Sequence, residues 1–232
     1  QPSRSFLSRW FGIYISPGTT LQDVVRKPDF ILPLVVSIIS ALVITETMLA
    51  KIGMERIIRN SIAQSGRQMT AEQMDQAVQG GATIGLVLSH VGALLGPPIV
   101  LVLIAALGLG IVNVIYGGAI NFKTAFSVAC YSNLLNVLGV VMAVPMILFG
   151  DPEHFNPQNP TPTNLGFFLN PLETSKPLMA FAGSLDLFSF WYIALLGIGF
   201  SAATGGKTKG FSMGVAFFGL WLIYVLAKVG LA

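Results

Sequence analysis

The sequence predicts an all-α fold, a polytopic membrane bundle of about five transmembrane helices. Of the 232 residues, 53% are hydrophobic and only 10% are charged, whereas a soluble domain carries about a quarter charged residues. The apolar residues also form long runs, each able to cross a hydrocarbon core of about 30 Å as a helix. Too few charges remain to cover a globule with a solvated surface, so a lipid bilayer is the expected environment.

Five ranges are the expected spans, and together they form one transmembrane domain over residues 30–232. They are residues 30–49, 82–116, 124–149, 178–204 and 211–231. The second range has no charged residue over about 35 positions, which is roughly 50 Å of helix. Because two spans and a turn need more than about 40 residues, one long helix is predicted rather than a re-entrant pair. Gly96-Pro97-Pro98 predicts a kink in it.

Residues 1–29 are expected to be a cytoplasmic or interfacial segment before the first span. Aromatic residues accompany Arg4 and Arg9 in this segment. That composition predicts rings at headgroup depth and arginines that face lipid phosphates.

The expected outer face carries a helical hairpin over residues 50–81 and a loop over residues 150–176. The first span can continue into water as a helix until Ser65-Gly66. Thr70 with Gln73 then predicts a capping box that starts a short helix ending at Gly80-Gly81.

The distribution of basic residues predicts a cytoplasmic N-terminus and an outer C-terminus. In that orientation the inner side holds seven basic residues against two acidic ones, and the outer side holds six against six. Short inner loops support the assignment, because the positive-inside rule acts through Lys and Arg near span ends. The inner basic residues are Arg4, Arg9, Arg26, Lys27, Lys123, Lys207 and Lys209. A bacterial inner membrane is the expected location.

Composition also excludes several functions. The net charge of +3 is too small and dispersed for a nucleic-acid partner, and the lone Cys130 supports no disulfide framework. The sequence contains no GxSxG, HExxH or Walker A motif. We therefore predict no catalytic residues, no metal site, no cofactor and no enzymatic activity.

Four ionisable residues fall at similar depth in the outer half of the predicted bundle: Glu46, His90, Asp186 and Lys228. Intramembrane ionisable residues are costly and point to function by default. They predict either a shared proton or cation site, or separate interfacial positions at which Lys228 snorkels and pairs with Asp186. The second interpretation is favoured, and it places Asp186 inside the fourth span, facing the bundle, with Lys228 or His90 as its nearest partner.

Three asparagines form a second polar set. Asn133 and Asn136 are three residues apart on the third span, and Asn113 lies on the preceding span. They predict interhelical hydrogen bonds or, as an alternative, the lining of a solute path. Glycine pairs with GxxxG spacing, Gly81/Gly85, Gly92/Gly96 and Gly210/Gly214, predict close helix packing within the chain or between chains.

Three stretches resemble the bacterial branch of the Yip (Ypt-interacting-protein-like) family of five-span membrane proteins. They are SPGTTLQDVVRKPDFILPL (16–34), FSVACYSNLLNVLG (126–139) and SLDLFSFWYIALLGIGFSAATG (184–205). The resemblance implies five spans and a cytoplasmic N-terminus. Its eukaryotic members bind Rab-type GTPases partly through a longer N-terminal region, so Rab binding is not expected here.

The leading functional hypothesis is a non-enzymatic scaffold or accessory subunit that contacts a membrane-protein partner through its helices. The small-residue faces and the family resemblance favour it. The alternative is a small-solute or ion transporter or channel that uses the outer polar cluster. The absence of an evident inverted repeat weighs against the alternative.

Overall fold

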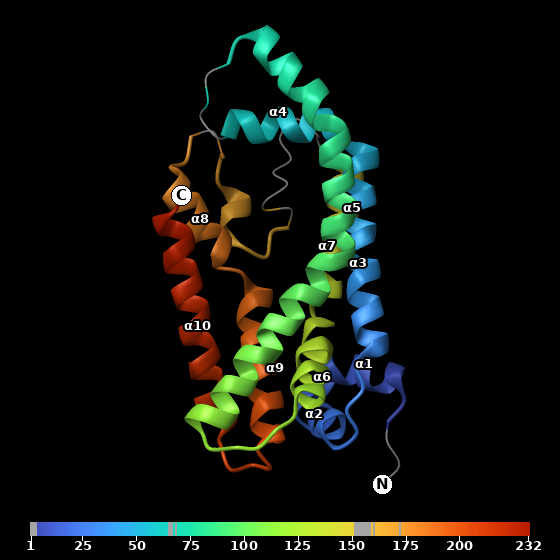
Figure 1. Ribbon diagram of the computed structural model, residues 1–232, viewed down its shortest axis with the longest axis vertical. Coiled ribbons are helices and arrows are strands. Elements are labelled where there is room, and N and C mark those ends of the chain that lie inside the picture. The colour runs from blue at the N-terminus through green and yellow to red at the C-terminus, as the bar shows by residue number, and fades with distance from the viewer. Residues whose placement is uncertain (1–3, 65–66, 68, 151–158, 160, 172) are drawn as a thin grey trace.

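The computed structural model describes residues 4–64, 67, 69–150, 159, 161–171 and 173–232. Within those residues the regular secondary structure is helical, and the pairing of Asn164 with Asp186 is an isolated bridge outside any strand. The predicted all-α membrane bundle is therefore confirmed. The N-terminus lies at one end of the bundle and the C-terminus towards the other end (Figure 1), the arrangement that an odd number of crossings produces.

Among the described residues, four helical segments are long and apolar enough to cross a membrane. They are α3 (Ile31–Lys51), α5 with the π-helical turn after it (Ala71–Ile115), α6 with α7 (Phe122–Phe149) and α10 (Gly210–Gly230). The apolar helix α9 (Leu187–Ala203) has 17 residues, roughly 25 Å. Because α8 precedes α9 and packs beside α10, α8 and α9 together reach the length of a span.

The N-terminal residues form a helical hairpin of α1 (Phe6–Ile15) and α2 (Pro17–Arg26). The Ser5 hydroxyl caps α1 by accepting a hydrogen bond from the Ser8 N–H. Pro17 begins α2, where its missing N–H leaves no helical bond unmade. The buried apolar residues of both helices join one cluster with residues of α6 and α9, so this hairpin is packed onto the bundle.

The helix of the first span covers the predicted residues 30–49 but stops well before Ser65, up to which a continuation was expected. α3 stops at Lys51, and Gly53 has a φ of +82°, a left-handed conformation that favours glycine. The chain therefore turns, and a separate helix, α4 (Met54–Gln64), lies crosswise to α3 and α5 (Figure 1). The prediction that the helix of the first span continues into water is therefore wrong. The predicted break at Ser65-Gly66 lies outside the described residues.

α5 is a single helix from Ala71 to Gly110, followed by the π-helical turn Ile111–Ile115. The predicted capping box is confirmed: the Thr70 hydroxyl accepts from the Gln73 N–H, and the Gln73 side chain accepts from the Thr70 N–H. The expected helix end at Gly80-Gly81 is wrong, because tertiary packing outweighs the low helix propensity of two glycines.

The two prolines of α5 lie inside the helix and do not end it. Pro97 and Pro98 are internal to the 40-residue helix, which changes direction along its length in Figure 1. One long helix is therefore the correct alternative, and a re-entrant pair is not formed. Each proline removes a donor and leaves the carbonyl four residues earlier without its usual partner.

Short helical elements complete the chain. α6 (Phe122–Asn133) and α7 (Asn136–Phe149) are separated by a break at Leu134 and Leu135. A 3₁₀ turn (Leu165–Phe168) packs against α8 (Lys176–Ser184) in the loop before α9. The expected fourth span is thus interrupted between α8 and α9.

Glycines allow the closest helix contacts in the core. A Cβ on Gly197 of α9 would lie 2.8 Å from the Gly214 backbone nitrogen of α10. A Cβ on Gly108 of α5 would lie 2.1 Å from the Phe200 ring of α9. The main buried cluster joins α5, α6, α9 and α10, so these contacts hold the four helices together.

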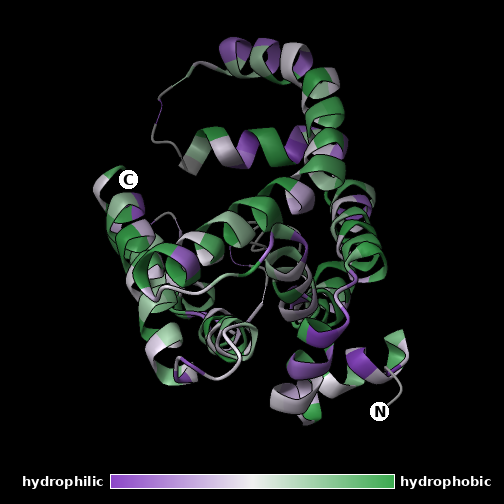
Figure 2. Cartoon of the chain, turned by 60° about the horizontal axis from the view of Figure 1, so that its bottom comes forward, coloured by the Kyte–Doolittle hydropathy of each residue, from purple (hydrophilic) through white to green (hydrophobic). Residues whose placement is uncertain are grey.

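The polar residues gather at the two ends of the structure. Figure 2 shows hydrophobic residues along the long helices, and hydrophilic residues on the N-terminal helices, on α4 and on the first turns of α5. At the end that carries α4, an Arg59–Asp75 ion pair of 2.6 Å links α4 to α5. The apolar side chains exposed along the spans match a lipid environment.

Candidate functional site: polar groups at three levels of the bundle

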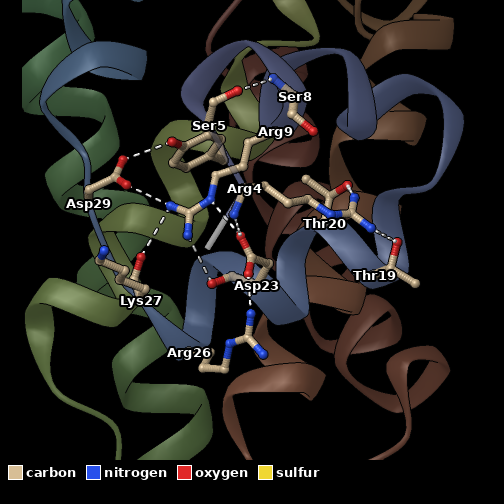
Figure 3. Close-up of polar contacts among 11 residues, drawn as sticks. Arg4, Ser5, Ser8, Arg9, Thr19, Thr20, Asp23, Arg26, Lys27 and Asp29 are labelled. Atoms are coloured by element: carbon tan, nitrogen blue, oxygen red, sulfur yellow. Dashed lines mark hydrogen bonds and ion pairs between the residues drawn. The ribbon is translucent and has the colours of Figure 1, made fainter. Parts of the chain in front are cut away.

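A buried ion-pair network lies where the N-terminal hairpin meets the bundle (Figure 3). Arg9 on α1 has 1% of its side chain exposed, and its Nε lies 2.8 Å from Asp23 Oδ2. Its Nη1 lies 2.6 Å from Asp29 Oδ2 and also donates to the Lys27 carbonyl. A guanidinium can be buried at such a site because its donors are met in a fixed fork geometry.

Two further contacts connect this network, the Arg9 network, to the third span. The Tyr131 hydroxyl on α6 donates to Asp29 Oδ1 at 2.8 Å. The Arg9 guanidinium carbon lies 5.7 Å from the centre of the Tyr131 ring, a cation–π distance. Asp29 therefore joins α1 to α6 across the link between α2 and α3.

Asp23 is the most heavily bonded carboxylate of the network. It accepts hydrogen bonds from the Arg9 and Arg26 side chains and from the Arg4 N–H. Burial raises the pKa of the Asp23 carboxyl, but these hydrogen bonds outweigh burial and hold the pKa below its usual 3.8. The carboxylate stays charged at neutral pH, as the buried Arg9 requires.

The sequence prediction for the N-terminal arginines is wrong for Arg9. Arg9 faces two carboxylates inside the protein instead of lipid phosphates. Arg4 also bonds within the hairpin, to Thr19 and Thr20. Asp23 and Asp29 follow Arg9 closely in the sequence and could have suggested an ion pair. The turn at Ser16 folds α2 back onto α1 and brings these carboxylates to Arg9, and composition does not reveal that turn.

The middle level is a chain of hydrogen bonds that links α7, α6 and α3. Asn136 Nδ2 donates to Asn133 Oδ1 at 2.8 Å, and Asn133 Nδ2 donates to Ser37 Oγ at 2.9 Å. Ser37 Oγ then donates to the Pro33 carbonyl. Asn113 instead bonds both backbone groups of Ile120 and so holds the loop between α5 and α6. The expectation of interhelical bonds thus fits Asn133 and fails for Asn113.

The third level is the contact between Glu46 on α3 and His90 on α5. His90 Nε2 lies 2.7 Å from Glu46 Oε1, and His90 Nδ1 lies 2.7 Å from the Leu86 carbonyl. Both ring nitrogens of His90 thus face an oxygen atom, one from Glu46 and one from its own helix. The His90 side chain is 47% exposed and the Glu46 side chain is 60% exposed, so the pair lies on the surface of the bundle.

Asp186 and Lys228 do not join that pair, and they do not form an ion pair with each other. Asp186 is the N-cap of α9, and its carboxylate accepts from the Ser189 N–H and hydroxyl at 2.8 and 3.0 Å. Lys228 Nζ donates to Ser184 Oγ at 3.3 Å. Asp186 therefore lies at the break between α8 and α9 rather than within a continuous helix, because helix capping starts α9 there. The four-residue cluster is thus one pair and two separate groups.

No three His, Cys, Asp or Glu residues in the described part of the chain could share a metal ion. Asp151, Glu153 and His154 lie outside the described residues. The three polar levels bond helices to one another and leave hydrogen-bonding capacity at the middle level. Such an arrangement can hold a partner or admit a polar solute.

The bundle defines a polytopic α-helical membrane protein with polar contacts between its spans. The sequence profile of the Yip1 domain matches residues 11–229, nearly the whole chain. The chain therefore belongs to the Yip1 domain family, which confirms the family resemblance. No curated protein and no solved structure gives a significant match.

Proposed function

We propose that the protein is a non-enzymatic scaffold or accessory subunit that holds a partner membrane protein against α5. The observation that carries this proposal is the glycine pair Gly92/Gly96. A Cβ at either position would meet no atom within 4 Å outside its own helix. Small residues drive helix association in lipid because they let backbones approach closely.

The other two glycine pairs are used differently. The Gly81 and Gly85 positions face α4, with Ile58 and Met54 as the neighbours of an added Cβ. The backbones of Gly210 and Gly214 lie against Gly197 of α9, since a Cβ added on Gly197 would be 2.9 Å from the Gly210 oxygen and 2.8 Å from the Gly214 nitrogen; a Cβ added on Gly214 itself would meet no atom within 4 Å. Both pairs thus serve packing within the chain, which leaves Gly92/Gly96 as the pair open to another molecule.

The surface around Gly92 and Gly96 supports contact with a second helix. Val91, Leu95 and Ile99 flank the glycines and have 45%, 49% and 56% of their surface exposed. Exposed aliphatic side chains beside an open glycine stripe can pack around an approaching helix without a hydrophobic driving force. The partner is thus a membrane protein, with the lipid bilayer as the common environment.

The transporter alternative is the weaker proposal. It relied on Glu46, His90, Asp186 and Lys228 acting together, and only the first two are in contact. The middle-level asparagines are bonded to each other and to Ser37, which supports a role in joining helices.

The proposed setting is a bacterial inner membrane with the N-terminus in the cytoplasm, and Rab-type GTPase binding is not part of the proposal. In a Cys130→Ser background, Lys207→Cys and Glu173→Cys are expected to react from opposite sides of the membrane, since both native side chains are exposed and at opposite ends of the predicted spans. An impermeant thiol reagent added to intact cells should label the Glu173 position alone. Labelling of both positions from outside contradicts this orientation.

A photo-crosslinking amino acid at Leu95, in native membranes, tests the scaffold proposal. We expect one defined protein adduct from Leu95, and loss of that adduct in the Gly92→Ile variant because the added side chain blocks close approach. A crosslinker at Val215, also about half exposed but on α10, should give no such adduct. Gly219→Ile is the matched control, because its Cβ position is also open. A Leu95 adduct that persists in Gly92→Ile contradicts the proposal.

A further inference from the structure

The exposed face of α1, the first helix of the N-terminal hairpin, is apolar. Leu7, Phe11 and Ile15 follow one another at intervals of four residues and therefore share one face of the helix. They have 60%, 63% and 82% of their surface exposed. From these three residues, the α1 stripe, we infer that α1 lies in the membrane interface with the stripe among the acyl chains of phospholipids. The inference concerns a lipid contact and does not rest on the scaffold proposal.

The charged residue of α1 points away from the stripe. Arg9 is 1% exposed and bonds to Asp23 and Asp29 inside the protein. A helix in hydrocarbon turns its charged residues towards the bundle and its apolar residues towards lipid, whereas a helix in water carries polar residues on its exposed face. The two faces of α1 therefore have the arrangement of a helix in lipid.

The second helix of the same hairpin has the opposite character. The exposed residues of α2 are Thr19, Gln22 and Arg26, all of them polar. Gln22 lines a groove together with Gly205 and Gly206, the turn between α9 and α10, and α2 lies nearer that end of the bundle than α1 does (Figure 1). This difference is explained if α1 faces acyl chains while α2 faces headgroups and water.

A hydrogen bond places the end of α1 beside the interior of the third span. The Tyr14 hydroxyl on α1 donates to the Leu134 carbonyl at 2.7 Å. The candidate span is Phe122–Phe149, and Leu134 follows the 12 residues of α6, about 18 Å of helix. The C-terminal end of α1 is thus at the depth of a membrane-spanning segment, which favours lipid over water as its surroundings.

The α1 stripe also lies level with the surface that α3 presents to lipid. Arg9 Nη1 is 2.6 Å from Oδ2 of Asp29, two residues before α3 begins, so the middle of α1 is level with the start of that span. Ile31 and Leu32 in the first turn of α3 have 66% and 52% of their surface exposed. An interfacial helix buries its apolar face about 5–10 Å into the boundary between headgroups and acyl chains. One lipid leaflet can therefore cover the exposed apolar side chains of both helices.

Fluorescence quenching in phosphatidylcholine nanodiscs that hold one copy of the protein tests this inference. A fluorophore is attached to Phe11→Cys in the Cys130→Ser background. It is quenched either by lipid with a nitroxide near the top of the acyl chain or by iodide, which reaches both faces of the disc through water. We expect strong quenching by the nitroxide lipid and a loss of most of the iodide quenching that Gln22→Cys shows.

Gln22→Cys is the matched control, because Gln22 is also exposed but lies on α2. Ile15→Cys should behave like Phe11→Cys, and it tests the stripe even if the Phe11 variant does not fold. If iodide quenches both stripe positions as strongly as Gln22→Cys, the stripe lies in water and the inference is overturned. Protection of both positions from both quenchers shows that protein covers the stripe, which overturns the inference as well.

Discussion

Replacing Arg9 by Met is expected to destabilise the folded protein by about 3 to 5 kcal/mol, the effect of breaking a buried ion pair from one side. Arg9 is 1% exposed and contacts both Asp23 and Asp29. Without it, Asp23 keeps only its bonds to Arg4 and Arg26, and Asp29 keeps its bond to Tyr131. The α1–α2 hairpin then loses its charged connection to the third span.

Thermal unfolding in detergent micelles, followed by circular dichroism and by proteolysis of the N-terminal hairpin, measures this effect. Arg26→Met is the matched control: Arg26 also bonds to Asp23 but is 53% exposed, so its removal should cost about 1 kcal/mol or less. Adding Asp23→Asn to Arg9→Met should recover part of the stability, because the buried carboxylate that has lost its buried partner is then neutral. If Arg9→Met and Arg26→Met unfold at the same temperature, the network does not stabilise the fold as argued.

The Arg9 network also fixes the direction in which the stability of the folded protein changes with pH. The pKa of Asp23 is lower in the folded protein than its usual 3.8. Its contribution to stability is therefore fully present above that usual value and declines as the pH falls through the folded-state pKa. Wild-type protein should lose more stability on acidification than the Arg9→Met variant, whose Asp23 lacks its buried partner.

Replacing Gly197 by Val should have the second largest effect, a loss of about 3 kcal/mol from overpacking. The three atoms nearest to an added Cβ are all backbone: the Gly214 nitrogen at 2.8 Å, and the Gly210 oxygen and Gly214 Cα at 2.9 Å. Backbone atoms of two helices cannot rotate away as a side chain does. The axes of α9 and α10 must therefore separate, which weakens the contacts along their whole interface.

The experiment compares unfolding of Gly197→Val and Gly197→Ala with Gly219→Val. An added Cβ at Gly219 on α10 meets no atom within 4 Å, so that control should change stability little. Gly197→Ala should already be destabilising, because its Cβ alone makes the short contacts. A neutral Gly197→Ala would contradict the close packing of α9 on α10.

Local signals in the sequence predicted several elements well. The capping pair Thr70 and Gln73 begins α5 as expected, because both partners lie within one helical turn. The length of the uncharged run containing Pro97 and Pro98 distinguished one helix from two, since span length is set by bilayer thickness. The prediction failed where a turn depends on one backbone conformation, as at Gly53 after α3.

Among the candidate site residues, the contact of Glu46 with His90 and the bond from Asn133 to Ser37 involve residues far apart in the chain. Sequence marked three of these as polar groups within apolar runs, which are costly and so noticeable. It did not reveal their partners, because partner choice depends on helix rotation and crossing. The pairing of Asp186 with Lys228 was wrong because a local cap on Ser189 was available to the carboxylate.

By itself the sequence determined the membrane environment, the helical class and the family, because hydropathy and span length are summed over many residues and tolerate local error. Tertiary structure alone decided that Arg9 is buried between two carboxylates, that Gly197 meets Gly214, and that Ser40 and Asn136 share a cleft with Pro97. Each of these depends on the relative rotation and distance of two or more helices. In lipid those quantities are set by backbone approach and polar pairing, interactions between segments that no single segment encodes.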